Sequence, residues 1–370
     1  MSAEATITKI RTLPIQMEVA PDLVVHGAAG EHARSGFLLV QITASNGLMG
    51  YGEVSATPRW SGEDEATAEH FIKEILAPKL IGMPLEHAAL TDSVLDSVLH
   101  GNMFTKAGVS IALWDVYART LGISMAEALG GVVRHEVNIK CSLSGTPEQL
   151  RRSYTSASSL GFCAFKVKVG LDIDSDVERM ELARELVGPG TFLGADANTG
   201  WSREDAARAM ELFRPYDVAF IEQPIGAKDL VGMAALRDRG YPIIADESVG
   251  DMEDLQAVIS AGAADVASVY VGMSGGPGRA VAMGKAATAA GLDVILGSNG
   301  EMGIGAAAQL QVACALPELS TTIPSDIIGS HFYLEDILET ALPSNGSSVV
   351  LPNAPGLGVV PRSDLISRFS

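Results

Sequence analysis

The chain of 370 residues has little cysteine, and the three it has are scattered at Cys141, Cys163 and Cys314. An odd, dispersed set of this kind does not form a disulfide framework and is typical of a reduced, cytoplasmic setting. None of the three lies in a CxxC motif or beside a histidine cluster, so we expect them to be small core residues.

Basic residues are also in short supply. There are 45 acidic against 26 basic side chains, giving a formal charge of -19 and an isoelectric point near 4.7. A nucleic-acid-binding protein normally carries a basic surface, and an anionic membrane repels an acidic one, so neither partner is expected.

Long hydrophobic runs are missing as well. The first 20 residues contain no continuous apolar segment of the kind that a signal peptide needs. The charge-free stretch Met302–Pro317 is too short and too polar to cross a bilayer. We therefore expect a cytoplasmic protein without membrane spans.

What the chain does have is enough apolar material for a large core, with 47% hydrophobic and 19% charged residues. This excludes intrinsic disorder and, at this length, predicts two domains or one barrel with an appendage. Apolar and polar residues alternate in three runs, which predict strands at Thr6–Glu18, Gly36–Thr43 and Met49–Glu53. Segments with the apolar spacing of helices follow them. Residues 1–131 are therefore expected to form a small α+β domain.

From residue 132 onward short apolar strands alternate with amphipathic helices. The predicted strands are Val137–Ser142, Ala164–Val169, Phe192–Asn198, Val218–Pro224, Ile243–Glu247, Val266–Val271 and Asp293–Ser298. Repeated βα units predict a parallel α/β sheet, and their number favours closure into an eight-fold TIM barrel over residues 132–325. An open doubly wound sheet is the alternative, weakened by the lack of a glycine-rich dinucleotide fingerprint. Residues 326–370 are rich in proline and glycine and predict a loop and short-strand segment.

Polar side chains recur where these strands end, and the C-terminal ends of barrel strands form the active face of such folds. The residues are Lys166, Lys168, Asp196, Asn198, Glu222, Asp246, Glu247, Tyr270, Ser298, Asn299 and Glu301. The spacing from Lys168 through Asp196, Glu222, Asp246 and Tyr270 to Ser298 is 28, 26, 24, 24 and 28 residues. Each step is about one βα unit, so these side chains are expected at equivalent heights around the barrel. A lone Lys-x-Lys or strand-end aspartate is usually structural, but the ordered set is hard to obtain by accident.

The combination predicts chemistry at a metal. Converging carboxylates repel one another and need a cation, and an all-oxygen donor set selects Mg²⁺ before Mn²⁺. Two strand lysines on one face offer a base, whose pKa should fall toward neutrality beside another lysine and a dication. Together these groups suit one reaction. The metal binds a substrate carboxylate, a lysine removes the neighbouring α-proton, and the metal stabilises the resulting enediolate.

The chain resembles the enolase superfamily, within its mandelate racemase/muconate lactonizing enzyme group, over essentially its whole length. The matching motifs are Phe165-Lys166-Val167-Lys168, Asp196-Ala197-Asn198, Ile221-Glu222-Gln223-Pro224 and Ala245-Asp246-Glu247-Ser248. The resemblance implies a (β/α)7β barrel with an N-terminal α+β capping domain, to which the C-terminal segment returns. It implies Mg²⁺ ligation by Asp196, Glu222 and Asp246, with Lys168 as the α-proton base and Lys166 as its partner near the substrate carboxylate.

The same resemblance implies two lid loops, at about Val24–Gly30 and Ala56–Gly62, and a homo-oligomer between a dimer and an octamer. Candidate contacts to a small carboxylate substrate are His26, Thr57, Trp60, Asn198, Glu247, Ser298, Asn299 and Glu301.

Tyr270 departs from the group's pattern, because muconate cycloisomerases and dipeptide epimerases carry a lysine there. A phenol, with a reference pKa near 10, is a poor base but an adequate proton donor. Lys168 and Tyr270 therefore suit a β-elimination, and the variant resembles cis-3-hydroxy-L-proline dehydratases, whose product is Δ1-pyrroline-2-carboxylate. The alternatives are an amino-acid or hydroxyproline racemase or epimerase, a muconate-type cycloisomerase, and a non-catalytic carboxylate-binding barrel. Tyr270 could also serve only to pack or to position the substrate.

Overall fold

The computed structural model describes residues 5–28, 30–85 and 88–370. Its N-terminal part is built on an antiparallel sheet in the order β1 (Ile7–Glu18), β4 (Arg34–Ala44) and β5 (Met49–Val54). A turn over residues 45–48 joins β4 to β5 and sets the pairing of Ile42 with Gly50. We call this part, with the helices that cover it, the cap.

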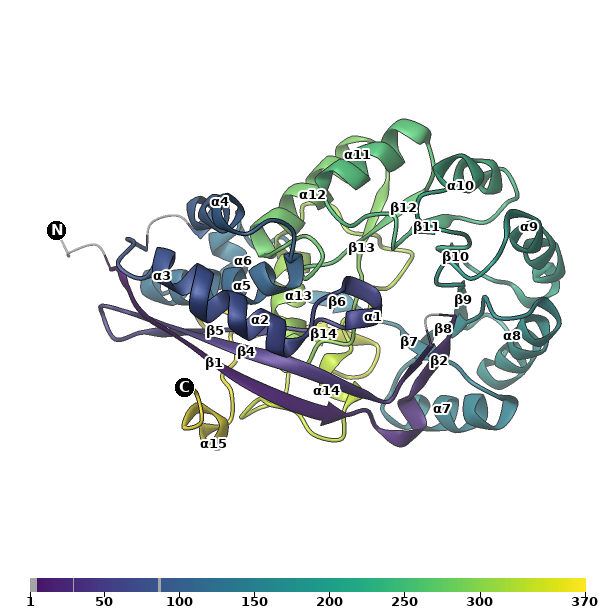
Figure 1. Cartoon of the computed structure of the whole chain (residues 1–370). Helices are drawn as coiled ribbons and strands as arrows, with labels where there is room; N and C mark the ends of the chain where they lie inside the picture. The colour runs from purple at the N-terminus through teal and green to yellow at the C-terminus, as the bar shows by residue number, and fades with distance from the viewer. Residues whose placement is uncertain (1–4, 29, 86–87) are drawn as a thin grey trace.

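The cap helices cover one face of this sheet (Figure 1). Those that pack on the sheet are α2 (Glu65–Phe71), α3 (Ala77–Leu80) and α5 (Met103–Leu121), with a π-helical turn at Ile72–Leu76. The other helices of the cap are α1 (Pro58–Ser61), α4 (Ala88–Val98), which packs on α5, and α6 (Met125–Ala128), which packs between α5 and α13 (Gly303–Ala315). The long helix α5 lies directly on β5 because glycine removes the side chain at the contact. A Cβ built on Gly52 would stand only 1.9 Å from the carbonyl oxygen of Gly108.

The second part is a curled sheet of seven parallel strands (Figure 1). In sheet order they are β7 (Cys141–Leu143), β8 (Ala164–Lys168), β9 (Phe192–Asp196), β10 (Ile221–Glu222), β11 (Ile243–Ala245), β12 (Val266–Val269) and β13 (Asp293–Leu296). The helices outside the sheet are α7 (Pro147–Ser159), α8 (Ile173–Val187), α9 (Arg203–Leu212), α10 (Leu230–Arg237), α11 (Met252–Ala261), α12 (Pro277–Ala289) and α13 (Gly303–Ala315).

A short extended segment closes this sheet into a barrel. Ser325 forms a parallel bridge with Ile139 on one side. On the other side the Asp326 N–H donates to the carbonyl of Leu296 at the end of β13. Residues 325 and 326 therefore take the eighth strand position, and we call them the closing segment. The expected division of the chain into 1–131, 132–325 and 326–370 stays a prediction, with its second boundary inside this segment.

One expected strand, Val137–Ser142, was wrong as a single element. The chain breaks into β6 (Glu136–Asn138) and β7, and β6 pairs antiparallel with β14 (Ser348–Val350) instead of joining the barrel. In β6 only the central residue is buried, as expected for a ribbon at the barrel's end, whereas burial is continuous from Ile139 to Cys141.

The C-terminal segment returns to the cap through α14 (Gly329–Phe332), β14 and α15 (Ser363–Ile366). The Leu357 N–H donates to the buried Asp115 carboxylate on α5. The last residue, Ser370, exchanges two backbone hydrogen bonds with Thr12 of β1. The expected α/β architecture, a modified barrel with an N-terminal capping domain, is thus confirmed. Among the described residues no helix has the length and apolar character to cross a bilayer.

Candidate active site

A cavity of about 580 Å³ lies where the barrel strands end, beneath the cap. The barrel supplies most of its polar lining, and the cap contributes residues of the β2 (Val25–Gly27) and β3 (Gly30–His32) hairpin and of the start of α1. The predicted residues that line it are Thr57, Trp60, Lys166, Lys168, Asp196, Asn198, Glu222, Asp246, Glu247, Tyr270, Ser298 and Asn299. Most of the ordered set is therefore brought together in one place.

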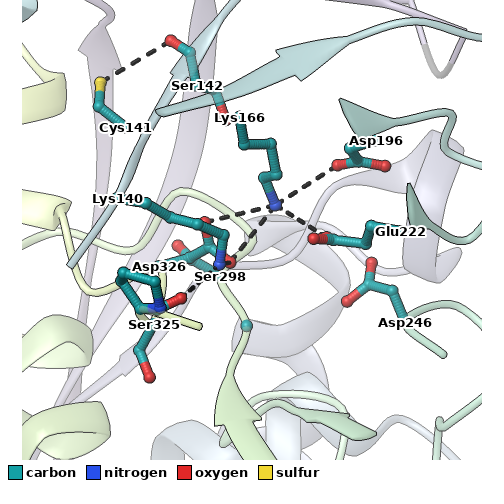
Figure 2. Close-up of polar contacts among 12 residues, drawn as sticks. Lys140, Cys141, Ser142, Lys166, Asp196, Glu222, Asp246, Ser298, Ser325 and Asp326 are labelled. Atoms are coloured by element: carbon teal, nitrogen blue, oxygen red, sulfur yellow. Dashed lines mark hydrogen bonds and ion pairs between the residues drawn. The ribbon is translucent and has the colours of Figure 1, made fainter. Parts of the chain in front are cut away.

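The two lysines of β8 point to the same side of the strand, as its two-residue period requires. The Lys166 ammonium lies among three carboxylates (Figure 2): Nζ is 2.7 Å from Glu222 Oε1, 3.4 Å from Asp196 Oδ2 and 3.3 Å from Asp326. The Lys168 ammonium donates to Asp196 Oδ2 at 2.6 Å and to Asn198 Oδ1 at 2.9 Å.

Two carboxylates of the set keep an unsatisfied oxygen. Glu222 Oε2 and Asp246 Oδ1 are buried and have no hydrogen-bond partner. Burial first, and then neighbouring carboxylates, raise the pKa of each to about 8. For Asp196 burial also acts upward, but Lys168 and Lys166 outweigh it and lower the pKa to about 2. Such oxygens suit a hard cation, because a bound cation would give each of them the partner that no hydrogen-bond donor of the protein supplies.

The charges of the cluster also suit a divalent ion. In the described residues around the cavity floor, five carboxylates (Asp196, Glu222, Asp246, Glu247 and Asp326) face three lysine ammonium groups (Lys140, Lys166 and Lys168). As the side chains lie, no three His, Cys, Asp or Glu residues in the described ranges are spaced to hold one ion. The Lys166 ammonium itself bonds the Asp196 and Glu222 carboxylates (Figure 2).

The expected fall in lysine pKa assumed a bound dication and stays a prediction. Among the protein's own groups, burial lowers the pKa of Lys166, but the carboxylates of Asp326, Glu222 and Asp196 together raise it well above the usual value. Asp326 is a carboxylate that the prediction did not include.

Tyr270 follows β12 and is buried, with 4% of its surface exposed. Its hydroxyl donates to Asp246 Oδ2 at 3.0 Å, and its ring centroid lies 5.3 Å from that of Trp60. Burial and then the surrounding carboxylates raise the pKa of the phenol well above 10. The hydroxyl therefore keeps its proton and acts as a donor.

Asn198 and Glu247 continue the contacts of Lys168. The Asn198 amide nitrogen donates to Glu247 Oε1 at 3.1 Å, and Glu247 Oε2 is buried without a partner. On the far side, Asn299 donates to the Ser55 carbonyl of the cap at 2.6 Å.

Two predicted substrate contacts do not line the cavity. Glu301 is buried behind Ser298, from which it accepts a hydrogen bond. The His26 ring is turned toward Gln149 of α7, at 3.2 Å, and toward Glu31. Ala29, within the first expected lid loop, lies outside the described residues.

Sequence reasoning missed Asp326 and its partner Lys140, whose ammonium lies 2.8 Å from Asp326 Oδ2. The signal was available in the spacing. Lys140 precedes Lys168 by 28 residues and Asp326 follows Ser298 by 28, so one further step of the βα period in each direction finds both.

Comparison with known proteins agrees with this geometry. Residues 149–365 match the family model "Enolase C-terminal domain-like", and residues 9–130 match "Mandelate racemase / muconate lactonizing enzyme, N-terminal domain". The chain belongs to the mandelate racemase/muconate lactonizing enzyme group of the enolase superfamily. It is thus an enzyme rather than a non-catalytic barrel.

Individual relatives align along nearly the whole enzyme. Muconate cycloisomerase 1 from Rhodococcus opacus is 31% identical, over 90% of each chain. The structure of muconate lactonizing enzyme from Pseudomonas fluorescens superposes with a TM-score of 0.92 at 25% identity, covering 98% of this chain and 99% of that one. The L-Ala-D/L-Glu epimerase from Bacillus subtilis superposes with a TM-score of 0.90 at 28% identity, covering 96% and 99%.

Proposed function

We propose that the enzyme is a Mg²⁺-dependent dehydratase that removes the α-proton of a small carboxylate and expels a β-hydroxyl. The proposed substrate is cis-3-hydroxy-L-proline and the product Δ1-pyrroline-2-carboxylate. The observation that carries the proposal is Tyr270, a buried phenol that lines the cavity and donates toward Asp246.

The positions of Lys168 and Tyr270 in the barrel support this assignment. Lys168 ends β8 and Tyr270 follows β12, four positions further in an eight-membered ring that includes the closing segment. The two side chains therefore enter the cavity from opposite sides. A base on one side and a proton donor on the other fit a reaction in which a proton and a hydroxyl leave neighbouring carbons.

In the proposed step the Lys168 side chain acts as the base that takes the α-proton, and the C–H electrons become the new C=C bond. The Cβ–O bond breaks, and the Tyr270 hydroxyl donates its proton to the leaving hydroxyl, which departs as water. The enamine then tautomerises to the cyclic imine. Asn198, bonded to both Lys168 and Glu247, holds the base in its place.

For the metal we propose Asp196, Glu222 and Asp246 as ligands, with Mn²⁺ as the other ion that such oxygens accept. When bound, Mg²⁺ would bind the substrate carboxylate and stabilise the negative charge that develops as the α-proton leaves. The support is the two buried oxygens without partners and the excess of carboxylates over ammonium groups. Lys166 stands beside these ligands and is proposed to face the substrate carboxylate. Thr57, Trp60, Ser298 and Asn299 stay predicted substrate contacts, and a homo-oligomer stays a prediction.

The test is incubation with cis-3-hydroxy-L-proline and Mg²⁺, with the cyclic imine trapped by o-aminobenzaldehyde. We expect product from the wild type, none after chelation with EDTA, and a loss of at least about a hundredfold in kcat for Lys168→Ala. Lys228→Ala, an exposed lysine in the loop after β10, is the matched control and should leave kcat unchanged.

An isomerase is the second candidate, because the relatives include a cycloisomerase and an epimerase. The two candidates differ in mass balance. In D₂O an epimerase or racemase returns substrate that carries α-deuterium, whereas the dehydratase releases a product that has lost water. Exchange without water loss would overturn the dehydratase proposal.

A further inference from the structure

Lys140 belongs to the cluster, but the proposed chemistry has no use for it. It precedes β7, and its side chain is fully buried. Its ammonium donates to Asp326 Oδ2 at 2.8 Å and to the Pro324 carbonyl at 2.7 Å, and it lies 5.7 Å from the centre of the Phe220 ring. A buried ammonium is costly unless it is paired in this way.

The contacts of Lys140 reach the reaction centre through one carboxylate. Asp326 lies between two ammonium groups, with Lys140 on one side and Lys166 at 3.3 Å on the other (Figure 2). The backbone of the closing segment is hydrogen-bonded to Leu296 and pairs with Ile139, so the backbone of Asp326 is fixed in place. Lys140 then fixes the direction of its carboxylate.

We propose that Lys140 is a positioning residue that shares the Asp326 carboxylate with Lys166, keeps Lys166 on Glu222, and so sets the charge that faces the metal site. This inference rests on the proposed function, in which Asp196, Glu222 and Asp246 hold Mg²⁺. Without Lys140 the cluster carries one more net negative charge. Asp326 is then left with Lys166 as its single ammonium partner and draws it from Glu222, which becomes freer to bind a cation.

Mg²⁺ binding measured by isothermal titration calorimetry tests this without any substrate. We expect Lys140→Met to bind Mg²⁺ roughly tenfold more tightly than the wild type, since an unneutralised charge acts across a poorly screened interior. Asp326→Asn should bind roughly tenfold more weakly for the opposite reason. The double variant removes both charges and should return to within about threefold of the wild type. Lys228→Met, which removes an exposed lysine, is the control and should leave the affinity unchanged.

The outcomes separate this inference from the proposed function. If the wild type gives no Mg²⁺ binding, the metal proposal fails and this inference fails with it. If the wild type binds but Lys140→Met folds and binds equally well, Lys140 is only structural and this inference alone is overturned. If Lys140→Met does not fold, the other two proteins decide. Recovery of affinity from Asp326→Asn to the double variant supports the pair, and equal affinities refute it.

Discussion

Glu53 on the cap allows one electrostatic prediction to be worked through. Its carboxylate is buried and accepts hydrogen bonds from the Met302 N–H at 2.8 Å and the Gly305 N–H at 2.9 Å, at the start of α13. A cap residue thus holds the helix that follows the cavity loop. Burial raises the pKa of Glu53 to about 8, the two N–H groups oppose this, and Glu301 and Asp336 add to it.

The sign and size of the effect of pH on stability follow from the difference between the pKa values of Glu53 in the unfolded and folded states. The unfolded chain loses this proton near pH 4.5, whereas the folded protein keeps it to about pH 8. The contribution of Glu53 to stability is therefore complete below pH 4.5 and is lost as the pH rises through 8. At about 1.4 kcal/mol per pH unit, the loss between pH 6 and pH 8 is about 2 kcal/mol.

Glu53→Gln removes the titration and keeps the shape. At pH 6 it should be less stable than the wild type by about 1–3 kcal/mol, because the amide can accept from only one of the two N–H groups. At pH 8 that gap in the free energy of unfolding should narrow by about 2 kcal/mol. Urea unfolding at both pH values measures the free energies, with equal m-values as the condition for comparison.

The matched control is Glu185→Gln, which changes an exposed carboxylate on α8. It should alter the free energy of unfolding by less than about 0.5 kcal/mol at either pH. If the gap between the wild type and Glu53→Gln is the same at pH 6 and pH 8, Glu53 does not titrate in this range and the reasoning is wrong.

Two further predictions concern the site and the cap. Tyr270→Phe should lower the rate of water loss by about 10²–10⁴-fold while α-deuterium exchange continues, because only the proton donor is removed; equal losses in both rates would show that Tyr270 merely supports the fold. Gly52→Ala should cost about 1–3 kcal/mol in urea unfolding, since its Cβ would meet the Gly108 carbonyl oxygen. Gly226→Ala, with no atom within 4 Å of the new methyl group, should cost less than about 0.5 kcal/mol, and a similar cost at both positions would contradict the packing argument.

The strands of the barrel could be predicted because each is a short apolar run followed by a polar residue. The spacing of these polar residues along the chain then predicted that they lie around one cavity, and Lys168, Asp196, Glu222, Asp246 and Tyr270 do so. This works because a parallel barrel repeats one local unit, so that spacing along the chain becomes position around the ring.

The closing segment could not be found in the same way. It pairs through single residues and follows Pro324, so neither alternation nor length marks it as a strand. The break between β6 and β7 was hidden for a related reason, since β6 depends on β14, more than two hundred residues away. Long-range partners of this kind leave no local signal.

The direction of the Lys166 pKa and the turn of His26 away from the cavity depend on neighbours rather than on pattern. The carboxylate of Asp326 helps to raise the pKa of Lys166. Contacts with Gln149 and Glu31 hold the ring of His26 away from the cavity. Each of these contacts is made by a residue outside the motif that suggested the role.

The two backbone hydrogen bonds between Ser370 and Thr12 have a consequence for the order of assembly. Thr12 lies in the first strand of the cap sheet, yet its partner Ser370 comes more than three hundred residues later. During synthesis Thr12 therefore stays without this partner while the barrel residues between the two are made. Contacts of such high sequence separation slow folding, so this contact between the cap and the C-terminal segment is expected to form late.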